Sequence, residues 1–271
     1  MKLAVSSIAW TNEEEAEVAD LLQKLGVKYV EIAPTKLWKD PTKATDQQIE
    51  DYKKFWEQRG IEIVAFQSML FTRPDLKIFE SEENRHQTLK YLHDFIRLAG
   101  KMKASRMVFG SPKNRQRSGL DYRTATAIAK DFFNELGNVA QENDVCFCIE
   151  PNPVDYACDF ITNARQGLDF VKSVNNKGFG LHLDIAGMTL AKDDVGASIE
   201  VAGSMLKHFH ISSPFLEQVE NRPDVRHEKA DQALKSISYK GYVSIEMKPA
   251  DVGENVYRVE RAVRFAQNIY T

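Results

Sequence analysis

The feature that most constrains the fold is a regular alternation of short apolar runs with amphipathic stretches. Between the runs, helical periodicity covers stretches such as Glu14–Leu25, Asp46–Gln58, Glu83–Met102, Tyr122–Asn143, Asp159–Asn175 and Val256–Ile269. Because each intervening helix carries the chain back to the edge where the previous strand began, the strands are predicted to pair in parallel. The apolar or β-branched runs predict eight strands: Lys2–Ala9, Tyr29–Ala33, Ile61–Gln67, Arg106–Gly110, Val145–Glu150, Phe179–Asp184, Lys207–Ile211 and Tyr242–Glu246.

Eight such units in 271 residues predict the α/β class, as a closed (β/α)8 TIM barrel that forms a single domain over residues 1–271. An open, doubly wound sheet is the alternative. Its nucleotide-binding versions are disfavoured, because no G-x-G-x-x-G follows the first strand and the sequence contains no Walker A motif.

Composition excludes several classes of protein. Apolar residues make up 43% and charged residues 28% of the chain, and no apolar run approaches the roughly 20 residues that span a bilayer. Because no run is long enough to span a bilayer, we expect no membrane as partner, and because Lys and Arg number 36 against 39 Asp and Glu, we expect no nucleic acid either. The three cysteines form no CxxC pair, and the N-terminus shows no cleavage site for export, which together predict a reduced cytoplasmic protein.

Acidic and imidazole side chains close four consecutive predicted strands. Glu150, Asp184 and Glu246 end the fifth, sixth and eighth strands, and His210 lies on the seventh. In a barrel of this kind the carboxyl ends of the strands meet at one mouth, where reactive groups lie. Three carboxylates and an imidazole suit one divalent ion such as Mn²⁺, Mg²⁺ or Co²⁺, with Zn²⁺ as a further option. Any one of these residues alone would be read as a helix cap or a packed histidine, but four on successive strands favour a metal site.

Three more residues at predicted strand ends are candidates for contact with a substrate. Gln67, at the end of the third strand, is a candidate for binding a hydroxyl group. Lys248 follows Glu246 by two residues, so it points to the same side and could hold an anionic group, or it is simply a solvated loop residue. Trp10 follows the first strand and either stacks on a ring or lines the rim.

Two basic or imidazole residues complete the candidate set. Arg115 lies in the segment Lys113–Arg117 after the fourth strand, where it either attracts an anionic ligand to the mouth or is solvated. His182 shares a strand face with Asp184 and is either a partner of the site or part of the barrel core.

Five local motifs resemble one known family, the xylose isomerase-like barrels. This family includes sugar isomerases, ketose 3-epimerases, inosose dehydratases and family 2 apurinic endonucleases. In its epimerase members, the resemblance implies that Glu150, Asp184, His210 and Glu246 bind one divalent ion, often manganese, and that Glu150 and Glu246 also move protons. The motifs are Val108-Phe109-Gly110-Ser111-Pro112, Ile149-Glu150-Pro151-Asn152, His182-Leu183-Asp184, His208-Phe209-His210-Ile211 and Ser244-Ile245-Glu246.

The chain departs from the family pattern at positions that contact substrate. Gly187 stands where many members have a His after the strand-six Asp, and Ser212–Phe215 lacks the Arg that epimerases place after the strand-seven His. The endonucleases have further His ligands where this chain has Gln67 and Gly110, so a trinuclear zinc endonuclease is not expected.

The leading functional hypothesis is a metal-dependent sugar isomerase or epimerase that acts through an enediolate. Glu150 and Glu246 would serve as the acid–base pair, and the partner would be a small sugar or sugar acid. A dehydratase of a sugar or inosose is the first alternative, followed by a metal-dependent phosphodiester hydrolase and by a non-catalytic sugar-binding barrel. The oligomeric state stays open, a homo-oligomer included.

Overall fold

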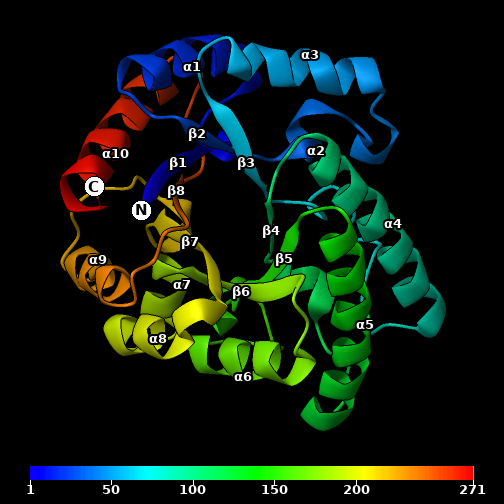
Figure 1. Ribbon diagram of the computed structural model, residues 1–271. Coiled ribbons are helices and arrows are strands. Elements are labelled where there is room, and N and C mark those ends of the chain that lie inside the picture. Colours follow the sequence, from blue (N-terminus) through cyan, green and yellow to red (C-terminus); the bar gives the residue numbers. More distant parts are fainter. Residues whose placement is uncertain (271) are drawn as a thin grey trace.

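The computed structural model describes residues 1–270 and contains a closed barrel of parallel strands ringed by helices (Figure 1). The first strand pairs with the last, with Lys2 opposite Tyr242 and Val5 opposite Ile245, and this pairing closes the sheet. The predicted (β/α)8 TIM barrel is therefore confirmed. The strands are β1 (Lys2–Ser6), β2 (Tyr29–Ile32), β3 (Glu62–Phe66), β4 (Arg106–Phe109), β5 (Cys146–Ile149), β6 (Phe179–Asp184), β7 (Leu206–Ser212) and β8 (Tyr242–Glu246).

The helices lie outside the barrel, and most predicted ones begin and end close to their expected residues. The predicted helix that starts at Asp159 begins only at Ala164, because the Asn163 side chain accepts the N–H of Gln166 and caps the helix there. The short helices α2, α7 and α8 were not among the stretches named from the sequence. The helices are α1 (Glu15–Lys24), α2 (Pro34–Leu37), α3 (Asp46–Glu57), α4 (Glu82–Lys101), α5 (Tyr122–Glu142), α6 (Ala164–Val174), α7 (Ile185–Leu190), α8 (Val195–Ala202), α9 (His227–Ser236) and α10 (Asn255–Tyr270).

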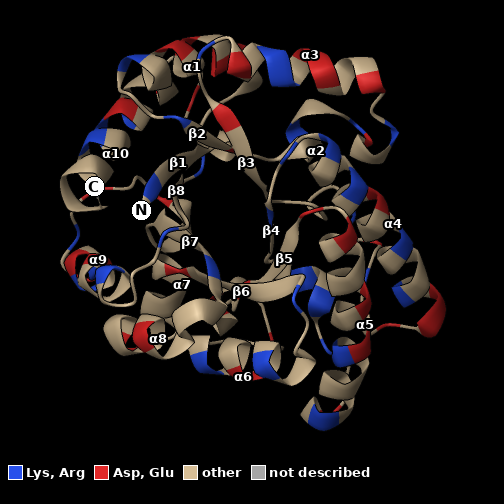
Figure 2. Ribbon diagram, in the orientation of Figure 1, with Lys and Arg blue, Asp and Glu red and all other residues tan. Residues whose placement is uncertain are grey.

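The main apolar core fills the layer between barrel and helices. Leu22, Trp56, Phe95 and Phe133 from four different helices are fully buried there. Charged residues lie mostly on the outer surfaces of the helices (Figure 2). This arrangement follows from the amphipathic periodicity of the helical stretches. Among residues 1–270, no helix has the length and apolar character needed to cross a membrane.

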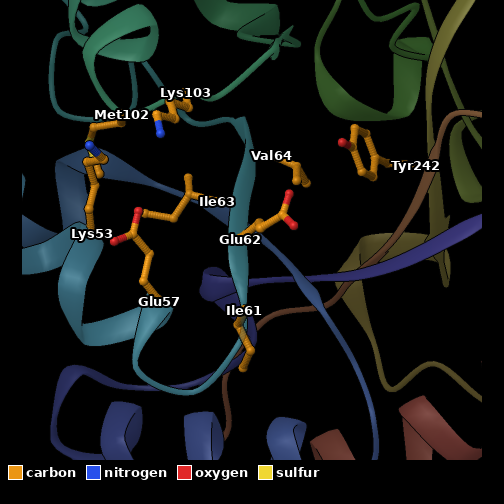
Figure 3. A pocket seen from close by; sticks show the side chains of 9 residues that line it. All are labelled: Lys53, Glu57, Ile61, Glu62, Ile63, Val64, Met102, Lys103 and Tyr242. Carbon is orange, nitrogen blue, oxygen red and sulfur yellow. The ribbon is translucent and has the colours of Figure 1, made fainter.

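The interior of the barrel changes in chemical character along its axis. Toward the amino ends of the strands, Ala4 and Val64 form a small apolar cluster that Tyr29 and Tyr242 pack against. A hollow of about 190 Å³ adjoins the starts of β3 and β8 there, and Glu62 and Tyr242 line it (Figure 3). Toward the carboxyl ends, the buried side chains become polar. The chemistry of the molecule is thus placed at the carboxyl end of the barrel, as in other barrels of this class.

Candidate active site

A cavity of about 360 Å³ opens at the carboxyl ends of the strands, and we call it the inner cavity. Its lining includes Glu150, Asp184 and Glu246, which follow or end β5, β6 and β8. Asp184, His210 and Glu246 each offer one ligand atom, and these atoms lie within 4.8 Å of one another. Closure of the barrel therefore brings Asp184 close to Glu246, although the two residues are 62 positions apart in the sequence.

Asp184 is held in one orientation by two neighbours. The backbone N–H of Gly187 donates a hydrogen bond to Oδ1, and the hydroxyl of Ser212 donates one to Oδ2. Asp184 also caps α7, so the start of that helix and the end of β6 fix the carboxylate together. Burial and the charge of Glu246 raise the pKa of Asp184 to about 6, which reflects crowding of negative charge at this point.

His210 lies between two carboxylates. Its Nε2 is 2.9 Å from Oε2 of Glu31 on β2, and its Nδ1 is 3.2 Å from Oε2 of Glu246. Burial raises the pKa of Glu31, but the histidines outweigh this effect and lower it to about 2, so Glu31 is an anion. A carboxylate only accepts hydrogen bonds, so Nε2 carries the proton and Nδ1 faces the site. Burial would lower the pKa of His210, but Glu31 and Glu246 raise it well above its usual value.

Glu150 faces the inner cavity beside a glycine that makes room for it. A Cβ atom on Gly110 would lie 2.4 Å from Oε2 of Glu150, so the carboxylate occupies space that only glycine leaves open. Burial and the nearby charges of Glu246 and Asp184 raise the pKa of Glu150 to about 8. A shift of this kind marks a carboxyl group that is buried and crowded by like charge, a repulsion that a nearby cation would relieve.

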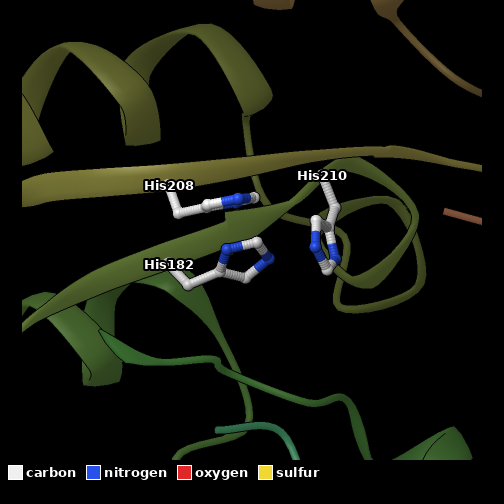
Figure 4. A group of neighbouring side chains, drawn as sticks. All are labelled: His182, His208 and His210. Atoms are coloured by element: carbon white, nitrogen blue, oxygen red, sulfur yellow. The ribbon is translucent and has the colours of Figure 1, made fainter. Parts of the chain in front are cut away.

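Three histidines meet directly below the inner cavity. His182 on β6 and His208 and His210 on β7 point toward one another (Figure 4), with ring centroids 4.1 to 5.2 Å apart. Both ring nitrogens of His182 and of His208 lack a hydrogen-bond partner within the described residues. Burial lowers the pKa of His208 to about 3 and that of His182 well below its usual value, so both are neutral. They form the floor of the site and have no exposed surface.

Three of the residues predicted to contact substrate line the mouth. Gln67 borders the inner cavity, and its Nε2 donates to Ser6 Oγ. Trp10 and Lys248 line a neighbouring space instead. Trp10 is fully buried, with its ring 6.3 Å from that of Trp56. The Nζ of Lys248 forms an ion pair with Glu217 at 2.6 Å.

The structure corrects the predicted placement of Arg115 and places His182 in the barrel core, one of its two predicted alternatives. Arg115 is fully buried, and its guanidinium is satisfied there by hydrogen bonds that it donates to the backbone oxygen of Glu150 and to Oδ1 of Asn152. It supports the wall that carries Glu150 and does not face the mouth. His182 has no exposed surface and is not part of the lining of the inner cavity, so its predicted contact with a substrate is not supported.

Glu31 is a buried charged residue beside the candidate site that the sequence analysis did not single out. It is fully buried in a strand of otherwise apolar character, Tyr29–Ile32, and that buried charge was the available signal. Ionised side chains are rarely buried unless they are paired, so an acid in such a run indicates a partner elsewhere in the fold. Besides His210, the partner is Ser244, whose hydroxyl donates to Oε2 of Glu31 at 2.7 Å.

The loop after β7, where this chain lacks the Arg of the epimerases, lies at the inner cavity. Phe215 and Leu216, in the loop where an Arg is absent, form part of the inner cavity wall. Both have positive φ angles, 60° and 57°, which non-glycine residues seldom adopt. The loop is held by Tyr156 Oη, which accepts the N–H of Phe215, and by the N–H of Lys248, which donates to the backbone oxygen of Leu216 at 2.8 Å.

Comparison with known proteins agrees with this architecture. The family model described as xylose isomerase-like TIM barrel matches residues 19–269. A D-psicose 3-epimerase of Ruminiclostridium cellulolyticum is 27% identical over 271 residues, covering 94% of this chain and 88% of that protein.

Two solved structures show the same fold. The D-psicose 3-epimerase with D-tagatose from Clostridium cellulolyticum H10 has a TM-score of 0.83 at 20% identity and covers 100% of this chain and 99% of that one. The IOLI protein with a bound zinc atom has a TM-score of 0.79 at 16% identity and covers 100% of this chain and 98% of that one.

Proposed function

Because this chain belongs to the xylose isomerase-like TIM barrel family, we propose that it is a divalent-metal-dependent sugar epimerase. One observation carries the proposal. Asp184, His210 and Glu246 converge on one point at the edge of a cavity, and Glu150 lines the same cavity. The D-psicose 3-epimerase that this chain resembles favours epimerisation over the dehydratase and hydrolase alternatives.

The donor set fits a divalent cation. Clustered carboxylates raise each other's pKa, as they do for Glu150 and Asp184, and a cation would remove that repulsion. Oxygen ligands with one imidazole suit Mn²⁺, Mg²⁺ or Co²⁺, and Zn²⁺ is also accommodated by such ligands. Asp184, His210, Glu246 and Glu150 would hold the ion. When bound, it supplies a Lewis acid that stabilises negative charge on a carbonyl oxygen of the substrate.

The two glutamates would move the proton. A C–H bond beside a carbonyl loses its proton to one carboxylate, and the other carboxylate returns a proton to the opposite face of the same carbon, which inverts that centre. Return to the neighbouring carbon would instead give aldose–ketose isomerisation. Glu150 and Glu246 follow β5 and end β8, non-adjacent strands that both reach the inner cavity, so they can approach a substrate from different sides. Gln67 lies in the same wall and is placed to bind a hydroxyl group.

The proposed epimerase activity is tested by measuring exchange of carbon-bound hydrogen of the sugar with deuterium from the solvent. Manganese-loaded protein is incubated with ketoses, D-psicose and D-tagatose among them, in D₂O, and products are examined by NMR. Deuterium at the inverted carbon supports the proposal. Products of hydrolysis without carbon-bound deuterium contradict it, and so does the absence of turnover across the panel.

A pair of variants separates the two roles. Asp184→Asn removes a ligand only, so excess Mn²⁺ should restore part of its activity. Glu246→Gln also removes a proton-transfer group, a role worth roughly 10²–10⁴-fold in rate, which added metal cannot replace. Equal rescue of both variants by saturating Mn²⁺ would show that Glu246 has no acid–base role.

We also place the enzyme in the cytoplasm. Cys146, Cys148 and Cys158 are all free and buried in the structure, a state that fits a reducing compartment. Fractionation of the source cells, with detection of the protein by antibody, tests this placement.

A further inference from the structure

One side of the inner cavity is built from large apolar and aromatic side chains, and we call it the apolar wall. It consists of Tyr156, Phe215 and Leu216, and all three line the cavity. The rings of Tyr156 and Phe215 pack edge to face with their centroids 5.7 Å apart. The carboxylates of the candidate metal site line the same cavity, so a molecule bound there meets a charged surface and an apolar one.

The backbone of the apolar wall is paired with the protein itself. The N–H of Phe215 donates to Tyr156 Oη at 3.0 Å, and the N–H of Leu216 donates to the backbone oxygen of Ser213 at 3.0 Å. The backbone oxygen of Leu216 accepts the N–H of Lys248 at 2.8 Å. These donors are therefore not free for a hydroxyl group of a sugar, whereas the hydroxyl hydrogen of Tyr156 remains available as a donor.

The conformation of the wall indicates that its apolar side chains have a role. Phe215 and Leu216 both adopt left-handed backbone angles, in which glycine and asparagine are more stable than large side chains. Such strain persists only where surrounding contacts impose it, and it is concentrated at functional sites. The chain therefore presents two large apolar groups to the cavity at a cost in backbone energy.

The apolar wall lies close to the groups proposed to transfer protons. Tyr156 belongs to the loop after β5, which begins at Glu150, and Leu216 is bonded to Lys248, two residues beyond Glu246. A sugar carbon near the reacting centre can thus face this wall. A hydroxyl group held there would lose hydrogen bonds to water without regaining them from the backbone of the wall, whereas a methyl group has none to lose.

We propose that the apolar wall selects a deoxyketose, a sugar with a methyl group in place of a terminal CH₂OH group, and that Leu216 determines this preference. The inference rests on the proposed function for the reacting ketose and on the lining of the cavity for the methyl group. The chemistry of the wall is the same for a methyl group at either end of the sugar.

Binding measurements test the preference without requiring turnover. Affinities of the manganese-loaded protein for D-psicose, 1-deoxy-D-psicose and 6-deoxy-D-psicose are measured by calorimetry. An apolar pocket rejects an added hydroxyl group by roughly ten- to a hundredfold, so one of the two deoxy sugars should bind more tightly than D-psicose by that factor. The deoxy sugar that does so identifies the end that meets the wall.

Variants assign the preference to the wall. Leu216→Asn keeps a residue that tolerates the left-handed backbone but is polar, so it should lower the affinity ratio to about one. Leu216→Met stays apolar and should keep the ratio. Leu120→Asn is the matched control, because Leu120 is a partly buried leucine of the loop after β4 that lines neither the inner cavity nor the neighbouring space. Each sugar has the same composition in solution for every variant, so a changed ratio reports on the protein.

Tyr156→Phe tests the remaining donor. The ratio should stay the same, because the wall remains apolar and no sugar hydroxyl group loses a partner. If this variant weakens binding of D-psicose but not of the deoxy sugars, the wall holds a hydroxyl group and the inference is wrong.

The other outcomes separate this inference from the proposed function. Affinities of both deoxy sugars within about threefold of D-psicose overturn it, since an apolar pocket discriminates more strongly. It is also overturned if no sugar binds, if Leu216→Asn keeps the full ratio, or if Leu120→Asn lowers the ratio equally. A deoxy preference without deuterium incorporation leaves the selective wall standing and contradicts the epimerase proposal. Deuterium incorporation into D-psicose with no deoxy preference has the reverse meaning.

Discussion

Replacing Glu31 by Gln tests whether this buried residue prepares His210 for metal binding. The carboxylate accepts the Nε2 proton of His210 at 2.9 Å and the hydroxyl hydrogen of Ser244 at 2.7 Å. Gln has nearly the same size but no charge, so the substitution leaves no cavity in the barrel interior. What changes is the strength of the bond that keeps Nδ1 of His210 turned toward Glu246.

The expected loss follows from this geometry. A carboxylate that hydrogen-bonds a metal-binding histidine fixes its tautomer and ring orientation, and its removal typically lowers metal affinity by about 10- to 100-fold. This range corresponds to roughly 1.4–2.7 kcal/mol of binding free energy. Because Glu31 is fully buried and lies outside the cavity lining, it cannot act by touching substrate.

The assay is titration of metal-free protein with Mn²⁺, followed by calorimetry and by the melting temperature. Glu62→Gln serves as the matched control, because Glu62 begins the next strand, is exposed and lies at the other end of the barrel. The control should bind Mn²⁺ as the wild type does. If folded Glu31→Gln also binds Mn²⁺ within twofold of the wild type, the positioning role of Glu31 is refuted.

Three further predictions concern the site and the stability of the barrel. Gly110→Ala should fold, yet its Cβ would displace the Glu150 carboxylate and lower kcat by roughly 10²-fold or more; unchanged kcat would contradict this. Removal of the ion by EDTA should lower the melting temperature by about 5 °C or more, reversibly with Mn²⁺, since binding to the native state stabilises it. Burial would raise the pKa of Glu14, but hydrogen bonds from Asn255, Gly253 and Thr11 lower it to about 2 from 4.5. Ionised Glu14 therefore contributes about 1–3 kcal/mol to the free energy of unfolding above pH 4.5, and this contribution is lost as the pH falls toward 2. In urea unfolding, the stability of Glu14→Gln should therefore fall less steeply with decreasing pH than that of the wild type.

The periodicity of apolar residues within single segments was sufficient to predict the barrel and the residues at the ends of its strands. Period-two alternation places Glu150, Asp184 and Glu246 on one side of their strands, and parallel pairing brings all carboxyl ends to one face. The lengths of most helices followed from the periodicity of apolar residues. The start of α6 did not, because it depends on the Asn163 side chain, which accepts a hydrogen bond from the backbone N–H of Gln166 and so caps the helix.

Sequence by itself thus determined the order of elements, the parallel barrel and the acidic strand ends, because these depend on residues that are neighbours along the chain. Only the tertiary structure decided that Glu31 meets His210, 179 positions away, and that Arg115 turns inward to hold the wall behind Glu150. It also decided that Leu216, from the loop after β7, lines both spaces at the mouth. Such contacts arise when the sheet closes and loops from distant strands pack against each other, and no periodicity within one segment encodes which of them will meet.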